Sequence, residues 1–224
     1  MSPPLERIGP TALNSRTRLK HQELLLATSN AGKVNEFRLL LPEYQLIAPA
    51  DLGLHLNVVE DGTNYYENAK IKAAAFARAS GRVCLADDSG LEVDALNNEP
   101  GIFSARYGGI TLNDEERCNL VLSKLFHVPD PPARSARFHC SIVAVSPDGR
   151  SCKGEGICEG RIATQAAGKE GFGYDPIFWL PQLGRTMAEL SAAKKNHCRH
   201  RRAALRELRP RLTSTFPELK VVAE

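Results

Sequence analysis

The chain has 224 residues, of which 42% are hydrophobic and 25% are charged, a composition typical of one globular domain with a substantial core. No apolar run approaches the roughly 18 residues that a membrane span needs. The net charge of +3 is too small to indicate a nucleic-acid-binding protein by itself.

The N-terminal segment is mainly basic and contains no apolar stretch resembling a secretory signal. An organelle-targeting sequence is the alternative, but the segment shows no clear amphipathic helix. We interpret residues 1–22 as a flexible basic tail, 23–212 as the folded domain and 213–224 as a C-terminal tail. We predict a cytoplasmic protein with no membrane partner.

The cysteines are scattered along the chain without a single Cys-x-x-Cys pair. Zinc sites usually use two close ligand pairs, and a chain of this size without a secretory signal does not need disulfide bonds. We therefore predict reduced thiols.

Residues 23–28 form a short apolar run that predicts a buried strand. The segment 34–41 has apolar residues at helical spacing and is followed by a proline, which predicts a helix. A second helix is predicted from about 65 to 80, because Asn64 and Glu67 resemble a capping box at its start and a glycine follows its end.

Residues 82–86 predict another buried strand, ended by an Asp-Asp-Ser-Gly turn at 87–90, and residues 91–96 alternate like a half-buried strand. Residues 136–145 and 150–163 flank a Pro-Asp-Gly turn, which predicts a β-hairpin.

From about 188 to 208 the sequence predicts a strongly basic helix. Strands mixed with helices, including one clear hairpin, predict an α/β fold with a mixed β-sheet flanked by helices. We expect the active site in a central cleft.

Several polar clusters follow the predicted strands and helices, where open α/β sheets bind ligands. The first is TSNAGK at 28–33. A strand that turns into a helix exposes backbone N–H groups to an anion, and Lys33 adds a positive charge for a phosphate. The alternative is that Asn30 only caps the helix and Lys33 is solvated. The spacing of the P-loop NTPases is absent.

The second cluster is acidic and contains Glu60, Asp61, Glu67, Asp87 and Asp88. Mg²⁺ is usually held by one or two carboxylates together with substrate phosphates, which two of these acids could supply. A helix cap is the alternative for Glu67, and an ordinary turn is the alternative for Asp87 and Asp88.

Two further clusters lie in the C-terminal part of the chain. In 168–178 several glycines surround Phe172 and Tyr174, whose rings either stack on a nucleobase or pack in the core. In the basic helix, Lys195, His200 and Arg201 contact phosphate and base if its N-terminal half faces the site. Its solvated face is predicted to carry Lys194, Arg202, Arg206 and Arg209.

Taken together, these clusters resemble the inosine/xanthosine triphosphate pyrophosphatase family over nearly all of the chain from Leu24 to about Leu208. Any one segment is a weak signal, but seven in the family's order are highly specific. They are TSNAGK, EDGTNYYENAKIKA, LADDSGLEVDAL, PGIFSARYGG, ARFHC, GFGYDPIF, and the lysine and His-Arg of the last helix.

The resemblance implies a Maf/Ham-type fold, a homodimer, and Mg²⁺-dependent hydrolysis of ITP, dITP and XTP to the nucleoside monophosphate and pyrophosphate. We expect Arg201 to donate to O6 of the base, with a break in the last helix near His200, and a backbone N–H is the alternative donor. The resemblance implies that Glu60 and Asp88 hold Mg²⁺ and that Asp88 is also the general base. It assigns substrate binding to Thr28, Ser29, Asn30, Ala31, Gly32, Lys33, Ser89, Phe172, Gly173, Tyr174, Asp175, Lys195, His200 and Arg201.

The sequence departs from the family around the expected base pocket. Glu170 replaces a usual glycine, Ala193 and Lys194 replace usual acidic residues, and Arg199 stands where serine is common. These departures affect base selectivity and rate rather than the class of reaction.

Three alternatives remain. A Maf-like pyrophosphatase for modified pyrimidine nucleotides usually opens with Ala-Ser-x-Ser-Pro-Arg-Arg, which differs from TSNAGK. A nucleic-acid-binding module would use the basic helix and show salt-sensitive binding. A degenerate nucleotide binder would keep the pocket without turnover.

Overall fold

The computed structural model describes residues 22–129, 133–191, 194–195 and 200–219. Its strands form a seven-stranded sheet in the order β2-β1-β3-β4-β5-β6-β7. Near one edge, β1 (Gln22–Leu26) lies parallel to β2 (Tyr44–Ile47) and to β3 (Cys84–Val93). The remaining pairs are antiparallel, so the sheet is mixed, as predicted.

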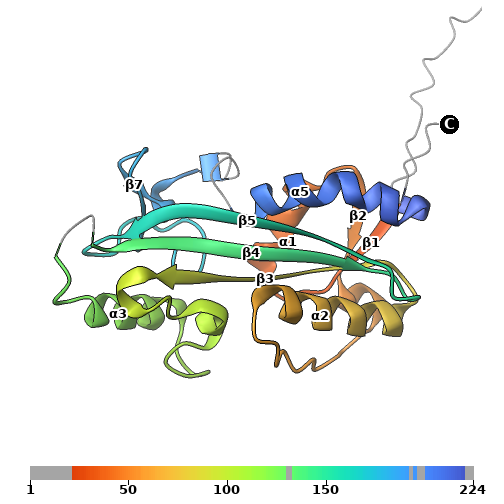
Figure 1. The fold of residues 1–224 in the computed structure, drawn as a ribbon, viewed down its shortest axis with the longest axis horizontal. Coiled ribbons are helices and arrows are strands. Elements are labelled where there is room, and N and C mark those ends of the chain that lie inside the picture. The colour runs from red at the N-terminus through yellow and green to blue at the C-terminus, as the bar shows by residue number, and fades with distance from the viewer. Residues whose placement is uncertain (1–21, 130–132, 192–193, 196–199, 220–224) are drawn as a thin grey trace, which may run out of the picture.

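The predicted hairpin is confirmed. β4 (Ser135–Val145) pairs along its whole length with β5 (Ser151–Ile162), and a tight turn joins them. Two short strands, β6 (Phe178–Leu180) and β7 (Arg185–Thr186), continue the sheet beyond β5. The three long strands β3, β4 and β5 run across the molecule and connect its two ends (Figure 1).

Among the described residues, the longer helices that flank the sheet are α1 (Ala31–Leu40), α2 (Tyr65–Ser80), α3 (Asp114–Lys124) and α5 (His200–Thr215). The prediction for α2 is confirmed, because Asn64 caps it by accepting from the amide of Glu67. The described residues also form short 3₁₀ helices at Pro49–Leu52, Asp94–Leu96, η3 (Gly101–Arg106), Met187–Glu189 and Pro217–Leu219.

The alternation of side chains along the parallel strands builds two core layers. Leu24, Leu26 and Leu85 face α1 and α5, whereas Leu25 and Cys84 face α2 on the other side. Figure 1 shows α5 above the sheet and α2 below it. Strands buried on both faces explain the continuous apolar runs in the sequence.

The main difference from the sequence prediction lies at residues 87–90, which do not form a turn. β3 runs through them without interruption and pairs with β4 on one side. On the other side β1 pairs with β3 only at Cys84 and Leu85. Asp87 and Asp88 therefore lie in mid-strand, at the point where the parallel neighbour stops. Aspartate is rare within strands, and ion pairs described below compensate its burial.

The predicted helix over 188–208 is also wrong in its extent. Met187–Glu189 is a single 3₁₀ turn, and Leu190 follows it with an extended backbone of φ −93° and ψ 141°. α5 begins at His200 and continues through Pro210 to Thr215. The extended backbone at Leu190 and the continuation of α5 past residue 208 both follow from tertiary packing, which overrides local helix propensity.

The packed chain extends beyond the predicted boundary at residue 212. Phe216 is completely buried, Leu219 is 3% exposed, and both belong to the core layer that holds α1 and α5. Residues 213–219 therefore belong to the packed chain. The predicted N-terminal tail, 1–21, lies outside the described residues.

We predict that Phe216→Ala lowers the free energy of unfolding by about 3–5 kcal/mol, since it removes a fully buried aromatic ring. Phe126→Ala is the matched control, because Phe126 is 78% exposed, and it should change stability by less than about 0.5 kcal/mol. Denaturant titration of both variants gives the two values. Equal stability of the variants would mean that residues beyond 212 do not contribute to the core.

Candidate active site

The start of α1 is ordered by its own side chains. Asn30 caps the helix by accepting from the amide of Lys33 at 3.0 Å, and the Thr28 hydroxyl accepts from the amide of Asn30 at 3.2 Å. The capping interpretation of Asn30 is therefore confirmed. Lys33 is not solvated, however. Its ammonium lies 3.1 Å from Oδ1 of Asp87, and its side chain is only 17% exposed.

Asp87 is the centre of a buried ion network. Its other oxygen, Oδ2, accepts from Nε of Arg201 at 3.0 Å. Nη1 of Arg201 pairs with Glu36 at 3.0 Å, and Nη2 donates to the Ser89 hydroxyl at 2.7 Å. The network joins α1, β3 and α5. Each of the three guanidinium nitrogens of Arg201 thus donates to a protein acceptor.

The ion pairs decide the charge state of Asp87. Burial alone would raise the pKa of this fully buried carboxyl, but Lys33 and Arg201 outweigh it and hold the pKa well below its ordinary value. Burial likewise opposes the charge of Arg201, and Asp87 and Glu36 reverse that effect, so the pKa of Arg201 is raised. Both groups are charged in the folded protein.

Two glycines allow α5 to bring its basic residues onto the sheet. A Cβ atom on Gly154 would lie 2.1 Å from the carbonyl oxygen of Ala204, and one on Gly156 would lie 2.1 Å from that of His200. No side chain fits in that space, so glycine is required for the close approach. The first turn of α5, including Arg201, consequently reaches β3.

Asp88 points to the opposite face of the sheet from Asp87, toward α2. Its carboxylate accepts from Nδ2 of Asn68 at 3.1 Å and from the amide of Ser89 at 3.0 Å. Burial raises the pKa of Asp88, and the nearby Glu60 carboxylate adds to that, while Asn68 and Lys72 partly oppose it. Of the two adjacent aspartates, Asp87 and Asp88, it is Asp88 that lines a cavity.

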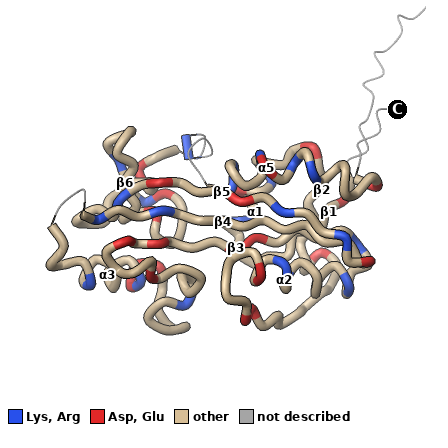
Figure 2. The backbone as a smooth tube through the Cα atoms, viewed as in Figure 1, with Lys and Arg blue, Asp and Glu red and all other residues tan. Residues whose placement is uncertain are grey.

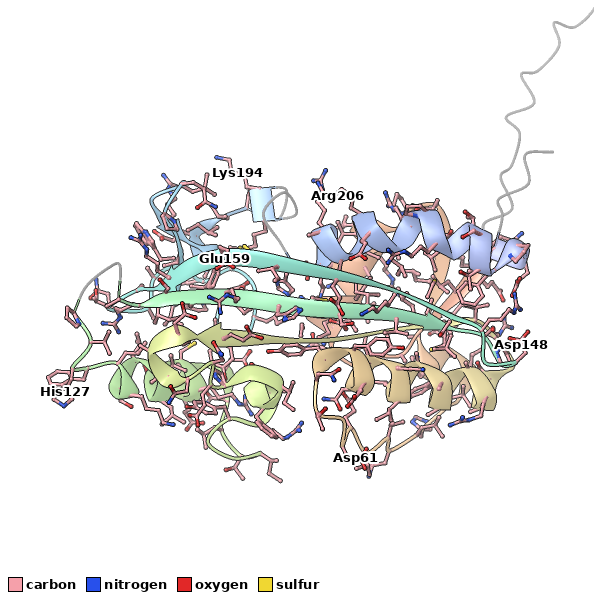
Figure 3. All side chains as sticks on the ribbon, viewed as in Figure 1. Asp61, His127, Asp148, Glu159, Lys194 and Arg206 are labelled. Carbon is pink, nitrogen blue, oxygen red and sulfur yellow. The ribbon has the colours of Figure 1, made fainter. Side chains whose placement is uncertain are left out.

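Glu60 approaches the same cavity from the loop before α2. Both of its oxygens lie 3.1 Å from the ammonium of Lys72 on α2. The other predicted acids do not join it. Glu67 accepts from the amide and hydroxyl of Thr63, as a helix-start residue does, and Asp61 is exposed at a loop end (Figure 3).

The residues present fit a hard divalent cation bound together with phosphate. Asp88 and Glu60 come from different segments, face one cavity, and provide only oxygen donors, as Mg²⁺ prefers. The Lys72 ammonium already places a positive charge at Glu60. Among the described residues no group of three or more His, Cys, Asp or Glu side chains is arranged around a metal position. Substrate phosphates would complete the coordination.

The cavity has a volume of about 360 Å³. Its lining includes the lysines and carboxylates Lys33, Glu60, Lys72 and Asp88. It also includes Ser104, Arg106, Asp114, Arg117, Phe138, Phe172, Gly173, Tyr174, Asp175 and His200. Charged and aromatic side chains thus share one space.

The aromatic part of the cavity lining is built on the glycine-rich loop before β6. Phe172 is half-buried, and a Cβ atom on Gly32 would lie 2.7 Å from its ring, so the start of α1 packs against it. Tyr174 is buried and donates to the carbonyl of Ser104 at 2.8 Å. The core interpretation therefore applies to Tyr174, which also lines the cavity.

Behind the loop lies a second buried ion pair. The Lys195 ammonium is 3.3 Å from Oδ2 of Asp175, and both side chains are less than 10% exposed. The ring of His200 stacks on that of Phe138, with centroids 5.0 Å apart. Lys195 itself does not line the cavity, so it acts on this wall through Asp175.

A second cavity of about 860 Å³ adjoins the first and shares Val58, Glu60 and Lys72 with it. Thr28, Ser29 and Ala31 line this second cavity rather than the first. The predicted phosphate-binding segment 28–33 therefore contributes residues to both cavities.

The remaining predictions for this region divide as follows. The solvated face is confirmed, since Lys194, Arg202, Arg206 and Arg209 are exposed, and Figure 3 shows Lys194 and Arg206 pointing outward. Two departures from the family, Ala193 and Arg199, lie outside the described residues. The five described cysteines form no disulfide; they are Cys84, Cys118, Cys140, Cys152 and Cys158.

Several site residues were missed at the sequence level. Asn68 and Lys72 stand four residues apart on α2 and so share a face. That spacing of polar residues on one helix face is a local pattern that could have indicated them. Glu36 stands three residues after Lys33 on α1 in the same way. Asp114 accepts from the amide of Gly173 at 2.7 Å, across a separation that no local pattern indicates.

The sequence model of the Ham1 family matches residues 24–211, which include every residue that lines the first cavity. The chain belongs to the Ham1 family. Ham1 membership accounts for the seven ordered segments, and it confirms the resemblance seen in the sequence. No helix among the described residues of this Ham1 protein is long and apolar enough to cross a membrane.

Curated Ham1 relatives are similar over nearly their whole length. A dITP/XTP pyrophosphatase from Staphylococcus aureus strain MRSA252 is 44% identical over 184 residues, covering 82% of this chain and 93% of that protein. One from Halalkalibacterium halodurans is 45% identical over 189 residues, covering 84% and 97%. The solved HAM1 protein from Coxiella burnetii has a TM-score of 0.77 at 41% identity, covering 86% and 99%.

The different environments of Asp87 and Asp88 predict opposite effects on stability. Asp87→Asn leaves Lys33 and Arg201 without their shared carboxylate and should cost about 3–5 kcal/mol. Because the pKa of Asp87 is lowered on folding, this contribution is present above the ordinary carboxyl pKa and is lost as pH falls. The pKa of Asp88 is raised, so its ionised form costs stability at neutral pH, and Asp88→Asn should raise Tm.

Thermal unfolding of both variants at neutral pH, without divalent cations, measures this difference. A common loss of stability in the two variants would contradict the division between the buried and the open aspartate.

Proposed function

We propose that the chain hydrolyses ITP, dITP and XTP to the nucleoside monophosphate and pyrophosphate, with Mg²⁺ as cofactor. The observation that carries the proposal is one cavity lined by both charged and aromatic side chains. The lysines and carboxylates Lys33, Lys72, Glu60 and Asp88 line it together with Phe172 and Asp175. A triphosphate attached to a flat, polar ring combines the same two kinds of chemistry. The proposal is supported by curated relatives named dITP/XTP pyrophosphatase.

The lysines and carboxylates of the cavity lining are suited to a triphosphate. Lys33 and Lys72 supply two ammonium groups, each already held by a carboxylate. Phosphate oxygens can replace or share those partners without placing an unpaired charge in the cavity. The exposed amides at the start of α1 add neutral donors for the same oxygens.

Glu60 and Asp88 would hold Mg²⁺, which supplies a Lewis acid that neutralises charge on the phosphate oxygens. Asp88 accepts a proton from the attacking water. The water oxygen forms a bond to the α-phosphorus, and the bond from that phosphorus to the bridging oxygen breaks. Lys33 and Lys72 stabilise the charge that develops on the leaving pyrophosphate.

The base would pack against Phe172, with Asp175 at the polar edge of the ring and Lys195 holding Asp175 from behind. Each buried polar group left unpaired by a wrong base costs about 1–3 kcal/mol, which allows a fixed pocket to discriminate. Because Arg201 already donates to three protein acceptors, we assign it to holding Ser89 and Asp87 rather than to O6. The proposal also includes a cytoplasmic homodimer, which rests on the sequence and the resemblance.

The test is a pyrophosphate-release assay with Mg²⁺ across ITP, dITP, XTP, ATP, GTP and the pyrimidine triphosphates. We expect ITP, dITP and XTP to be preferred over ATP and GTP, and we expect Asp88→Asn to lose more than about tenfold in kcat. Preference for pyrimidine nucleotides would favour the Maf-like alternative. Nucleotide binding without turnover of any triphosphate would favour a degenerate binder.

A further inference from the structure

Glu36 is a carboxylate in an unexpected place. It lies on α1 between Asn35 and the core residue Phe37, it is 4% exposed, and it lines neither of the two cavities. Burying a carboxylate costs several kcal/mol unless it is paired and hydrogen-bonded. A residue that only filled the core would be apolar at this position. The carboxylate of Glu36 therefore has a role other than packing.

The contacts of Glu36 lead back to the phosphate-binding lysine. Glu36 pairs with Nη1 of Arg201 at 3.0 Å, Nε of Arg201 pairs with Oδ2 of Asp87 at 3.0 Å, and Oδ1 of Asp87 pairs with Lys33 at 3.1 Å. The four charges alternate in sign and sum to zero. The chain of contacts leaves α1 at Glu36, crosses α5 and β3, and returns to α1 at Lys33.

We propose that Glu36 is a positioning residue for Lys33, acting through Arg201 and Asp87. This inference rests on the proposed function, in which Lys33 binds the triphosphate. Glu36 satisfies one side of the Arg201 guanidinium. Asp87 can then give one oxygen to Arg201 and keep the other for Lys33, and the lysine ammonium is held at the cavity wall before substrate arrives.

The consequence of removing the charge follows from the geometry of the pairs. An arginine that loses one carboxylate is best satisfied by two parallel bonds to the other, and the carboxylate it already contacts is Asp87. Lys33 then loses its anchor at Oδ1. Its four-carbon stem regains rotational freedom, which must be lost again when phosphate binds. Substrate binding weakens, whereas Asp88 on the other face of β3 is unaffected.

The experiment compares Glu36→Gln with Glu43→Gln. Glu43 also pairs with an arginine of α5, Arg209, at 3.2 Å, but that pair is partly exposed and far along the helix from Arg201. Glu36→Gln should raise KM for ITP about tenfold and change kcat less than about threefold. Glu43→Gln should leave both constants unchanged.

A double-mutant cycle with Lys33→Ala separates positioning from a general loss of stability. Lys33→Ala alone should raise KM, and adding Glu36→Gln to it should raise KM by less than about twofold more, because the affected group is gone. The same tenfold rise in both backgrounds, or a parallel fall in kcat, would overturn the proposal. If Glu36→Gln does not fold, Glu36→Asp, which keeps the charge, replaces it with the same criteria at a smaller amplitude.

Binding of inorganic tripolyphosphate, measured by calorimetry, keeps the inference separate from the proposed function. Its affinity should fall about tenfold in Glu36→Gln and stay unchanged in Glu43→Gln, whether or not ITP is hydrolysed. Failure of ITP turnover in the wild type with this shift present would contradict the proposed function alone. Turnover of ITP without the shift would contradict the role of Glu36 alone.

Discussion

The shared carboxylate of Asp87 is the interaction on which the site depends. It is completely buried in the middle of β3, and it balances one lysine from α1 and one arginine from α5. A buried carboxylate with one partner missing would be expensive. The positions of both helices relative to the sheet are therefore constrained by charge as well as by the apolar core. Figure 2 shows charged residues of both signs on α5 and on the strands beneath it.

The point at which β1 ends separates the two aspartates of β3 into different roles. Because β1 stops beside Leu85, the next residues of β3 have a free edge, and the alternation of the strand sends Asp87 to the α5 face and Asp88 to the α2 face. One acid becomes a structural counter-ion and the other lines the cavity. The two adjacent aspartates thus have different roles. Asp87 binds cationic side chains of the protein, and Asp88 is available to metal and water.

Much of this architecture could be predicted from the sequence. The hairpin and α2 were predictable because their signals are local, a Pro-Asp-Gly turn and an Asn64 cap followed by apolar spacing. The run through Asp87 was interpreted as a turn, because the partners that make a buried aspartate acceptable are Lys33 and Arg201, far away in the chain. Glu36 was missed for the same reason. Long-range ion pairs leave no local pattern, whereas periodicity and turn chemistry do.

The central claim is that the cavity directs water to the α-phosphorus, with pyrophosphate leaving toward Lys33 and Lys72. Hydrolysis of ITP in ¹⁸O-labelled water, followed by mass spectrometry of both products, tests it most directly. The account predicts one ¹⁸O atom in the monophosphate and none in the pyrophosphate, because the new bond forms at the α-phosphorus. Label in the pyrophosphate, or release of orthophosphate as the first product, would contradict it.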